Sequence, residues 1–504
     1  MLFNSYVFIF IFLPLTLLGY YLLNHVGHYT LSKVFLSLMS LWFYAYFNIY
    51  YLWIIVFSIG LNYLISLLIA KYEKTHSSLN QKARVVFLLL GLLLNLGLFF
   101  YFKYLDFFIE NVNLFIGSHL RVQNILLPLG ISFFTFQQLG YIIDRTRGTT
   151  EHLSLIDYVC FVTFFPQLIA GPIVLHSELV PQFNDLTKKR VNTDNLSRGI
   201  ILFTLGLGKK VLLADQLAIP VNSGFANAPL LDTTSTILMI LAYTFQIYFD
   251  FSGYSDMAIG LGLMFNIKLP INFNSPYQAA SVKELWQRWH ITLSRFFIQY
   301  VYIPLGGSRR GRVRTLINTF IVFFLSGIWH GANWTYIAWG TLQGLLVVWD
   351  NIGLIGVKGS NDKIKARFEM PRPLGWFLTF GFFNLSLIFF GSDSISTSIT
   401  LFKDLLMIKN TGYIYKLAST VKIPELYLLT KVVDMKFPTY NNILYLILFL
   451  LLLLISALFI KGRNAYTIAM ESKLTKKTIF ITALILAWCI ISFSQVSTFI
   501  YFNF

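Results

Sequence analysis

Long apolar runs alternate with short polar stretches along the whole chain. They lie near 5–23, 34–70, 85–108, 125–143, 155–171, 197–219, 233–265, 315–329, 333–350, 373–391, 441–460 and 478–495. A helix that crosses a bilayer needs about 20 mostly apolar residues, and the runs near 34–70 and 233–265 have room for two helices each. The pattern predicts an all-α polytopic membrane protein with roughly 11 to 13 spans. A closed β-barrel is disfavoured, because the runs are continuous and do not alternate.

Composition supports the bilayer as the main solvent of the chain. Of its 504 residues, 56% are hydrophobic and 12% are charged, whereas soluble domains carry about 25% charged residues. The net charge of +17 does not indicate nucleic-acid binding, because no soluble stretch is long enough. An acidic partner at the membrane surface and the enrichment of Lys and Arg in cytoplasmic loops both fit it. On the second ground, four basic segments are predicted to be cytoplasmic: Lys71–Arg84, Lys188–Arg198, Arg309–Arg314 and Lys461–Lys477.

We expect one integral-membrane domain over residues 1–504, with a core at about 125–350 and C-terminal helices at about 373–504. The longest polar parts, 352–372 and 403–440, are too short for a separate enzyme domain. The first apolar run has no basic leader and no clear cleavage site, so we interpret it as a retained helix. No repeat of fixed period is visible, which weakens a transporter interpretation.

The stretch from 266 to 314 differs from its surroundings. It mixes prolines, glycines, aromatic residues and charges between strongly apolar runs. Irregular backbone at membrane depth is tolerated only inside protein or beside a water-filled cavity. This stretch is therefore predicted to be a buried or re-entrant element that lines a cavity.

Two histidines are the leading chemical candidates. His330 is the only Asp, Glu, Lys, Arg or His residue between Arg314 and Asp350, and an ionisable group inside a membrane segment suggests function. An imidazole can take the proton of a hydroxyl nucleophile. His290, in LWQRWHITLSRF, would share a helical face with Trp286 and Ser294. A hydrogen-bonded core histidine at 330 and an interfacial helix around 290 are the structural alternatives.

Other charged residues have structural or binding interpretations. Arginines 288 and 295 suit phosphate recognition, whereas Arg309–Arg314 also fits anchoring at the cytoplasmic surface. Asp250 and Asp256 need partners, with Arg288 or Arg295 plausible, and Asp144 could pair with a neighbouring base. No metal site is expected, because the two histidines lack standard ligand spacing. The cysteines, Cys160 and Cys489, lie in apolar runs and do not indicate a disulfide or a nucleophile.

Several motifs carry a family resemblance over nearly the whole chain. They are LPLGISFFTFQQLGYIIDRTRG at 127–148, FFPQLIAGPI at 164–173, GKKVLLADQLA at 208–218, the block at 243–307, LSGIWHGANWTYIAWG at 325–340 and FIYFNF at 499–504. The chain resembles the membrane-bound O-acyltransferase family, and specifically its bacterial branch of alginate and peptidoglycan O-acetylation membrane subunits. The resemblance implies a many-helix bundle around a tunnel, with His330 as the catalytic residue and His290 in support. The substrate-binding candidates are Arg288, Asn274, Trp289, Ser294, Arg295, Asn333 and Trp329.

The same resemblance implies substrates and partners. The acyl donor would be cytosolic acetyl-CoA, with no bound cofactor. The acetyl group would pass across the cell membrane to an extracytoplasmic SGNH-type acetyltransferase or similar partner, which esterifies a polysaccharide. One departure is Gly391, where relatives commonly carry an arginine. Two alternatives stay open: D-alanyl transfer to teichoic acid within the same fold, and a transporter or flippase of another class.

Overall fold

The computed structural model describes residues 1–72, 78–358, 367–495 and 499–500. Within these residues the regular secondary structure is helical apart from one parallel strand pair, in which β1 (Ile355–Val357) pairs with β2 (Phe368–Met370) and Ile355 faces Phe368. The chain forms two compact units: Met1–Phe203 with Ser255–Ile271, and Thr204–Tyr254 with Asn272–Phe504. Helices α10 (Thr193–Gly208) and α12 (Thr233–Met264) contribute residues to both. The expectation of a single domain stays a prediction.

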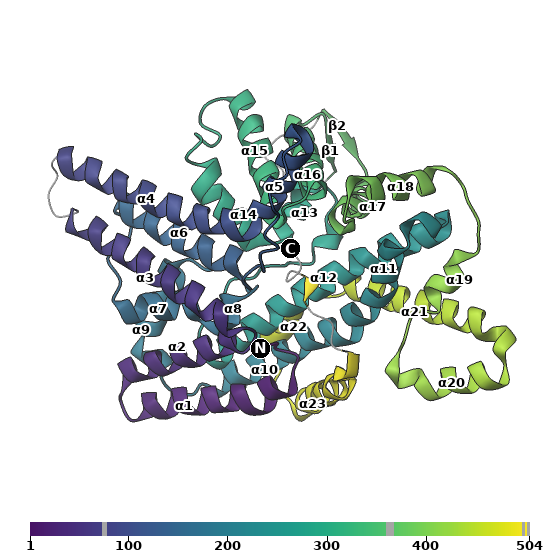
Figure 1. Ribbon diagram of the computed structural model, residues 1–504. Coiled ribbons are helices and arrows are strands. Elements are labelled where there is room, and N and C mark those ends of the chain that lie inside the picture. The colour runs from purple at the N-terminus through teal and green to yellow at the C-terminus, as the bar shows by residue number, and fades with distance from the viewer. Residues whose placement is uncertain (73–77, 359–366, 496–498, 501–504) are drawn as a thin grey trace. The chain divides into compact units, whose positions relative to one another are not determined.

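The first unit is built from helices of the N-terminal part. Its elements are η1 (Phe8–Phe12), α1 (Leu13–His25), α2 (Tyr29–Ala45), α3 (Ile49–Lys71), α4 (Ser78–Lys103), α5 (Leu105–Ile116), α6 (Ile131–Arg147), α7 (Leu155–Thr163), α8 (Phe165–Leu168), α9 (His176–Asn184) and η2 (Leu186–Lys188). Helices α3, α4 and α6 lie side by side (Figure 1) around buried Ile65, Ile69 and Ile142. Asn62 and Asn95 exchange amide hydrogen bonds between α3 and α4, a contact that holds helices together where apolar burial contributes little.

The second unit contains both predicted histidines. Its elements are η3 (Lys209–Ala214), α11 (Asp215–Ala226), η4 (Ala228–Leu230), η5 (Pro276–Gln278), α13 (Val282–Arg288), α14 (Ile291–Phe297), η6 (Ile298–Tyr302), α15 (Arg312–His330), α16 (Trp334–Ile352), β1 and β2, α17 (Arg372–Gly391), α18 (Ile395–Leu406), α19 (Tyr413–Ala418), η7 (Pro424–Leu426), α20 (Tyr427–Lys436), η8 (Pro438–Tyr440), α21 (Asn441–Lys461), α22 (Ala465–Glu471), α23 (Lys476–Ile491) and η9 (Ser492–Gln495). Helices α15 and α16 form a close hairpin (Figure 1). A Cβ at Gly327 would lie 2.8 Å from the Cα of Gly340, so glycines allow this approach.

Six helices of the described chain are long and apolar enough to cross a membrane. They are Phe8–His25, Ile49–Lys71, Leu79–Lys103, Arg312–His330, Arg372–Gly391 and Pro438–Lys461. At most 39% of the residues in any of these spans are buried, so most of their apolar side chains face outward, as a lipid surface requires. This confirms the all-α polytopic class. The larger number of 11 to 13 spans stays a prediction.

Two local expectations differ from the structure. The run near 34–70 does form two helices, α2 and α3, but the run near 233–265 is the single 32-residue helix α12. The run near 155–171 is α7 followed by the four-residue α8, because Pro166 stands in the first turn of α8 and cannot continue α7. The predicted cytoplasmic stretch Lys71–Arg84 and the motif at 499–504 lie partly outside the described residues.

Candidate active site

His330 is the last residue of α15 and is almost completely buried, with 2% of its surface exposed. Its ring packs against Trp329, Trp339 and Phe390, with centroid distances of 5.0, 5.2 and 5.2 Å. These rings come from α15, α16 and α17, so three helices fix the orientation of the imidazole.

His290 lies beside His330, with 6.4 Å between the ring centroids. It is fully buried and has a left-handed backbone, with φ 45° and ψ 51°. This conformation is costly for a residue other than glycine and is often retained at functional sites. The left-handed turn at His290 interrupts the helix, so that α13 ends before it and α14 begins after it. The expectation that Trp286, His290 and Ser294 share a face of one helix is therefore wrong.

Asn272 fixes the orientation of His290. The Oδ1 atom of Asn272 lies 3.2 Å from Nδ1 of His290, and it accepts hydrogen bonds from the hydroxyl of Thr292 at 2.9 Å and its backbone N–H at 3.3 Å. Because a backbone N–H can only donate, the atom they share must be an acceptor, and Nδ1 must donate to it. The neutral ring then carries its lone pair on Nε2.

Aromatic rings surround His290 on its other sides. Phe251 contacts the ring at 4.7 Å and Trp329 at 5.9 Å between centroids. His290 lies outside the six candidate spans, and burial lowers its pKa to about 3. At neutral pH the site therefore contains a neutral imidazole at 290, held by Asn272, next to His330.

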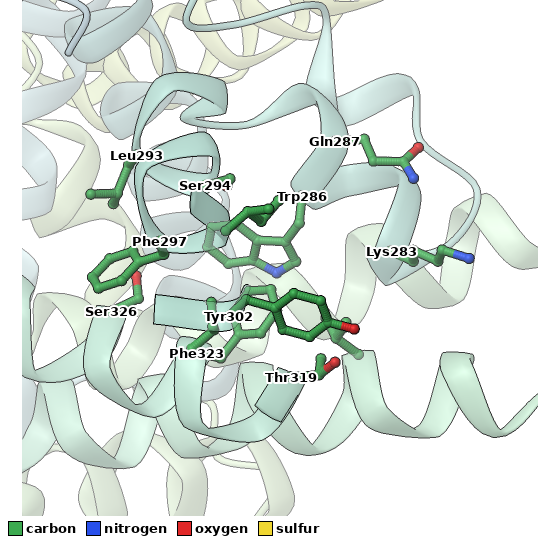
Figure 2. Close-up of a pocket in the computed structure, with 13 residues that line it drawn as sticks. Lys283, Trp286, Gln287, Leu293, Ser294, Phe297, Tyr302, Thr319, Phe323 and Ser326 are labelled. Carbon is green, nitrogen blue, oxygen red and sulfur yellow. The ribbon is translucent and has the colours of Figure 1, made fainter. Parts of the chain in front are cut away.

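A cavity of about 250 Å³ lies on the α13–α16 side of the two histidines. Figure 2 shows Lys283 and Gln287 at one end and Leu293 and Ser326 at the other, with Trp286 between them. The indole of Trp286 donates to Gln343 at 3.2 Å and packs at 5.7 Å against Trp339, which in turn contacts His330. The cavity is therefore separated from His330 by two tryptophan rings on one side and ends at Ser326, one helical turn before it.

The structure brings only some of the expected binding residues to the site. Trp289 and Trp329 are buried among the rings, and Ser294 lines the cavity. Arg295 is half-buried on α14. Arg288 instead pairs with Glu284 at 2.8 Å, and its guanidinium lies 3.4 Å from the carbonyl of Asn274, whose side chain is exposed.

Asn333 has a structural position as the N-cap of α16. Its side chain accepts from the backbone N–H of Thr335 at 3.0 Å and donates to the carbonyl of Asp393 at 2.7 Å. It thereby ties the turn after His330 to the start of α18. A direct role in binding substrate stays a prediction.

The acidic residues have mostly different partners from those expected. Asp250 pairs with Lys210, not with Arg288 or Arg295, and Lys210 also bonds Asp215 at 2.8 Å. Both acids are buried, and the single ammonium group of Lys210 bonds to each of them. Asp144 pairs with Arg147 at 3.8 Å, which confirms the expectation of a neighbouring base.

Four residues of the site were missed in the sequence. Asn272, Phe251, Trp339 and Phe390 contact the two histidines. The motif INFNSP contains two asparagines, Asn272 and Asn274, that could equally contact His290 on sequence grounds. Only the left-handed turn at His290 brings its ring to Asn272. The rings at 339 and 390 come from other helices and are hidden among many aromatic residues.

Comparison with known proteins now gives the family. The profile of the membrane-bound O-acyltransferase family matches residues 145–392, which include both histidines. The peptidoglycan O-acetyltransferase of Helicobacter pylori is 43% identical over 429 residues, covering 80% of this chain and 79% of that protein. The chain belongs to the membrane-bound O-acyltransferase family.

Two further relatives represent different reactions of this family. The probable alginate O-acetylase AlgI of Pseudomonas aeruginosa is 39% identical over 404 residues, covering 79% of this chain and 73% of that protein. The teichoic acid D-alanyltransferase of Streptococcus thermophilus is 29% identical over 290 residues, covering 53% of this chain and 69% of that protein. Membership identifies the protein as a multi-pass membrane O-acyltransferase, and the geometry shows where its candidate catalytic groups lie.

Proposed function

We propose that the protein takes acetyl groups from cytosolic acetyl-CoA and passes them across the cell membrane for O-acetylation of an exported or cell-wall polysaccharide. A partner such as an SGNH-type acetyltransferase would complete the transfer outside. The observation that carries the proposal is the buried pair His290–His330, together with an apolar cavity that ends at Ser326, one helical turn before His330. The names and coverage of the peptidoglycan and alginate relatives support acetyl as the group.

The cavity beside α15 suits the arm of a thioester donor. Thr319, Val322, Phe323 and Ser326 line it along roughly 10 Å of that helix. Arg309–Arg314 lie at the start of α15 and are expected on the cytoplasmic side, so in this proposal the cavity extends from that side toward His330. Lys283 at one end could meet a donor phosphate, while the apolar wall would accept the uncharged arm.

In the proposed reaction, His330 acts as the general base. It removes the proton from an acceptor hydroxyl, whose oxygen then forms a bond to the thioester carbonyl carbon. The carbon–sulfur bond breaks, and coenzyme A leaves as a thiol after taking up the proton from His330. The indole N–H of Trp339 has no hydrogen-bond partner among the described residues, and a donor at this place would stabilise negative charge on the carbonyl oxygen.

D-alanyl transfer from a carrier protein is the alternative within the family. It is disfavoured because the teichoic-acid relative matches only 53% of this chain, against 80% for the peptidoglycan relative. The two reactions differ in donor, so supplying each donor to the same protein separates them.

Radiolabelled acetyl-CoA turnover by the purified protein in nanodiscs tests the proposal. Replacing His330→Ala should lower the rate by about 10²–10⁴-fold, the usual contribution of a positioned base. His25→Ala is the matched control, because His25 is exposed at the end of α1. Thermal unfolding of each variant shows whether it is folded.

Each result of this assay has a defined meaning. Turnover by wild type and His25→Ala, but not by folded His330→Ala, supports the acetyltransferase. Equal turnover by all three proteins would mean that His330 is structural. Turnover with a D-alanyl carrier protein and none with acetyl-CoA would replace the proposal with D-alanyl transfer.

A further inference from the structure

A second cavity, of about 370 Å³, lies away from the histidine pair within the same unit. Its walls come from α10, η3, α11, α12, η7, α21, α22 and α23. Most of its lining side chains are apolar, and Leu452, Ile455 and Phe459 form one of its sides along roughly 10 Å of the span α21. The cavity therefore offers an apolar lining to a chain that runs parallel to a membrane helix.

The charged residues that line this cavity are more often basic than acidic. Lys209 and Arg463 both line it, against one acid, Glu425. The Glu425 carboxylate already accepts hydrogen bonds from Trp488 at 2.6 Å and Ser492 at 2.7 Å. Arg463 pairs with Glu471 at an exposed site, where an ion pair contributes little and is readily exchanged. The lining thus suits an anionic group.

The motif GKKVLLADQLA supplies one of these cations through an unusual backbone. Lys209 and Lys210 begin η3, a π-helical segment, a rare form that is frequent at functional sites. Lys210 is buried in its ion pairs with Asp215 and Asp250, whereas Lys209 lines the cavity and lies over the ring of Tyr248 at 5.6 Å. The two neighbouring lysines therefore differ in their environment: Lys210 lies in a buried ion-pair cluster, and Lys209 borders the cavity.

Gln216 is an independent indication of a ligand. Its side chain is 4% exposed and lines the cavity, yet its Oε1 has no hydrogen-bond partner among the described residues. A buried polar atom without a partner costs free energy. A ligand with a hydroxyl or a protonated phosphate oxygen would satisfy it.

We propose that this cavity binds an anionic glycerophospholipid, with an acyl chain along α21 and the phosphate between Lys209 and Arg463. Arg463 follows directly after the end of the span α21, which is the depth of lipid headgroups. Its loop, Lys461–Lys477, is expected on the cytoplasmic side, where anionic lipids attract basic residues. The proposal concerns a site separate from the histidine pair and does not depend on the identity of the acyl donor.

Native mass spectrometry of the full chain tests it. The protein is released from nanodiscs that contain equal amounts of phosphatidylglycerol and phosphatidylcholine, and retained lipids are counted. Wild type should retain one phosphatidylglycerol preferentially. The double variant Lys209→Gln with Arg463→Gln should retain it roughly tenfold less, which corresponds to about 1.4 kcal/mol.

Two further variants keep the proposal falsifiable. The pair Lys461→Gln with Arg309→Gln removes the same charge outside the cavity lining and should retain the lipid as wild type does. Ile455→Trp fills the cavity from a partly exposed position and should abolish retention while the protein stays folded. Equal retention by the cavity pair and the control pair would overturn the proposal. So would displacement of the lipid by coenzyme A or by a polyprenyl phosphate at lower concentration than phosphatidylglycerol requires.

Discussion

At the scale of single residues, the site depends on one strained turn. His290 adopts a left-handed conformation. The two residues after His290 donate their backbone N–H groups to the carbonyl and the side chain of Asn272. Such a conformation costs of the order of 1–3 kcal/mol and persists only when its surroundings enforce it. Asn272 therefore both stabilises the turn and sets which nitrogen of His290 carries the proton.

Asn272→Ala should lower the acyl transfer rate by about tenfold or more, because the His290 ring loses the partner that fixes its tautomer. The variant should also unfold at a lower temperature, since Thr292 loses its acceptor. Asn274→Ala is the matched control, two residues along and exposed, and should behave as wild type. Steady-state kinetics and thermal unfolding measure both effects. If Asn274→Ala proves the more damaging change, Asn272 does not position His290.

Gly391, the departure from the family pattern, has a steric cause. A Cβ there would lie 2.4 Å from the ring of Phe225 and 2.7 Å from that of Tyr243. No arginine fits this position without moving Phe225, so the ring occupies the space that a larger side chain would need.

Gly391→Arg should therefore destabilise the protein by roughly 1–3 kcal/mol, as overpacking does. Adding Phe225→Ala should recover part of this loss, because the two sites share one space. Thermal unfolding of the two single variants and the double variant measures the coupling. Additive effects would show that the two positions do not compete.

At the scale of elements, the sequence predicts the apolar runs and the irregular stretch between them, while the roles of both histidines stay predictions. It does not predict where that stretch breaks. The spacing of Trp286, His290 and Ser294 is helical, but hydrogen bonds from residues 291 and 292 to Asn272 stop the helix. The ion pair of Asp250 with Lys210 was also beyond prediction, because it depends on how two helices pack.

The α15–α16 hairpin positions His330 through a close contact of two glycines. Gly340→Ala should push the helices apart, because its Cβ would lie 2.6 Å from the Cα of Gly327. We expect both a lower unfolding temperature and a lower transfer rate. Gly381→Ala on α17 is the control, since its Cβ would meet nothing within 4 Å, and alanine favours helix. Unchanged activity in folded Gly340→Ala would show that the contact does not position His330.

At the scale of the whole molecule, labelling of introduced cysteines can test which side of the membrane each loop faces. Cys160 and Cys489 are 1% and 0% exposed, so the native protein should give little background. The basic loops predict that Lys82 and Arg309 lie in the cytoplasm, and the span Leu79–Lys103 then predicts that Glu110 lies on the opposite side.

In sealed right-side-out vesicles, an impermeant maleimide should therefore label Glu110→Cys, while Lys82→Cys and Arg309→Cys react only after the membrane is permeabilised. Labelling of all three positions in detergent is the control for reactivity. Reaction of Arg309→Cys in intact vesicles would reverse the assigned orientation of α15.

The length of α15 has a consequence for energy coupling. Arg312 and His330 stand at its two ends, roughly 27 Å apart along the axis, close to the thickness of the hydrocarbon core. In the proposed reaction the charged nucleotide stays on the cytosolic side, while the uncharged arm and its acetyl group extend toward the far end. Breaking the thioester would then drive export by itself, and cell-envelope esterification would need neither an ion gradient nor ATP outside the cytosol.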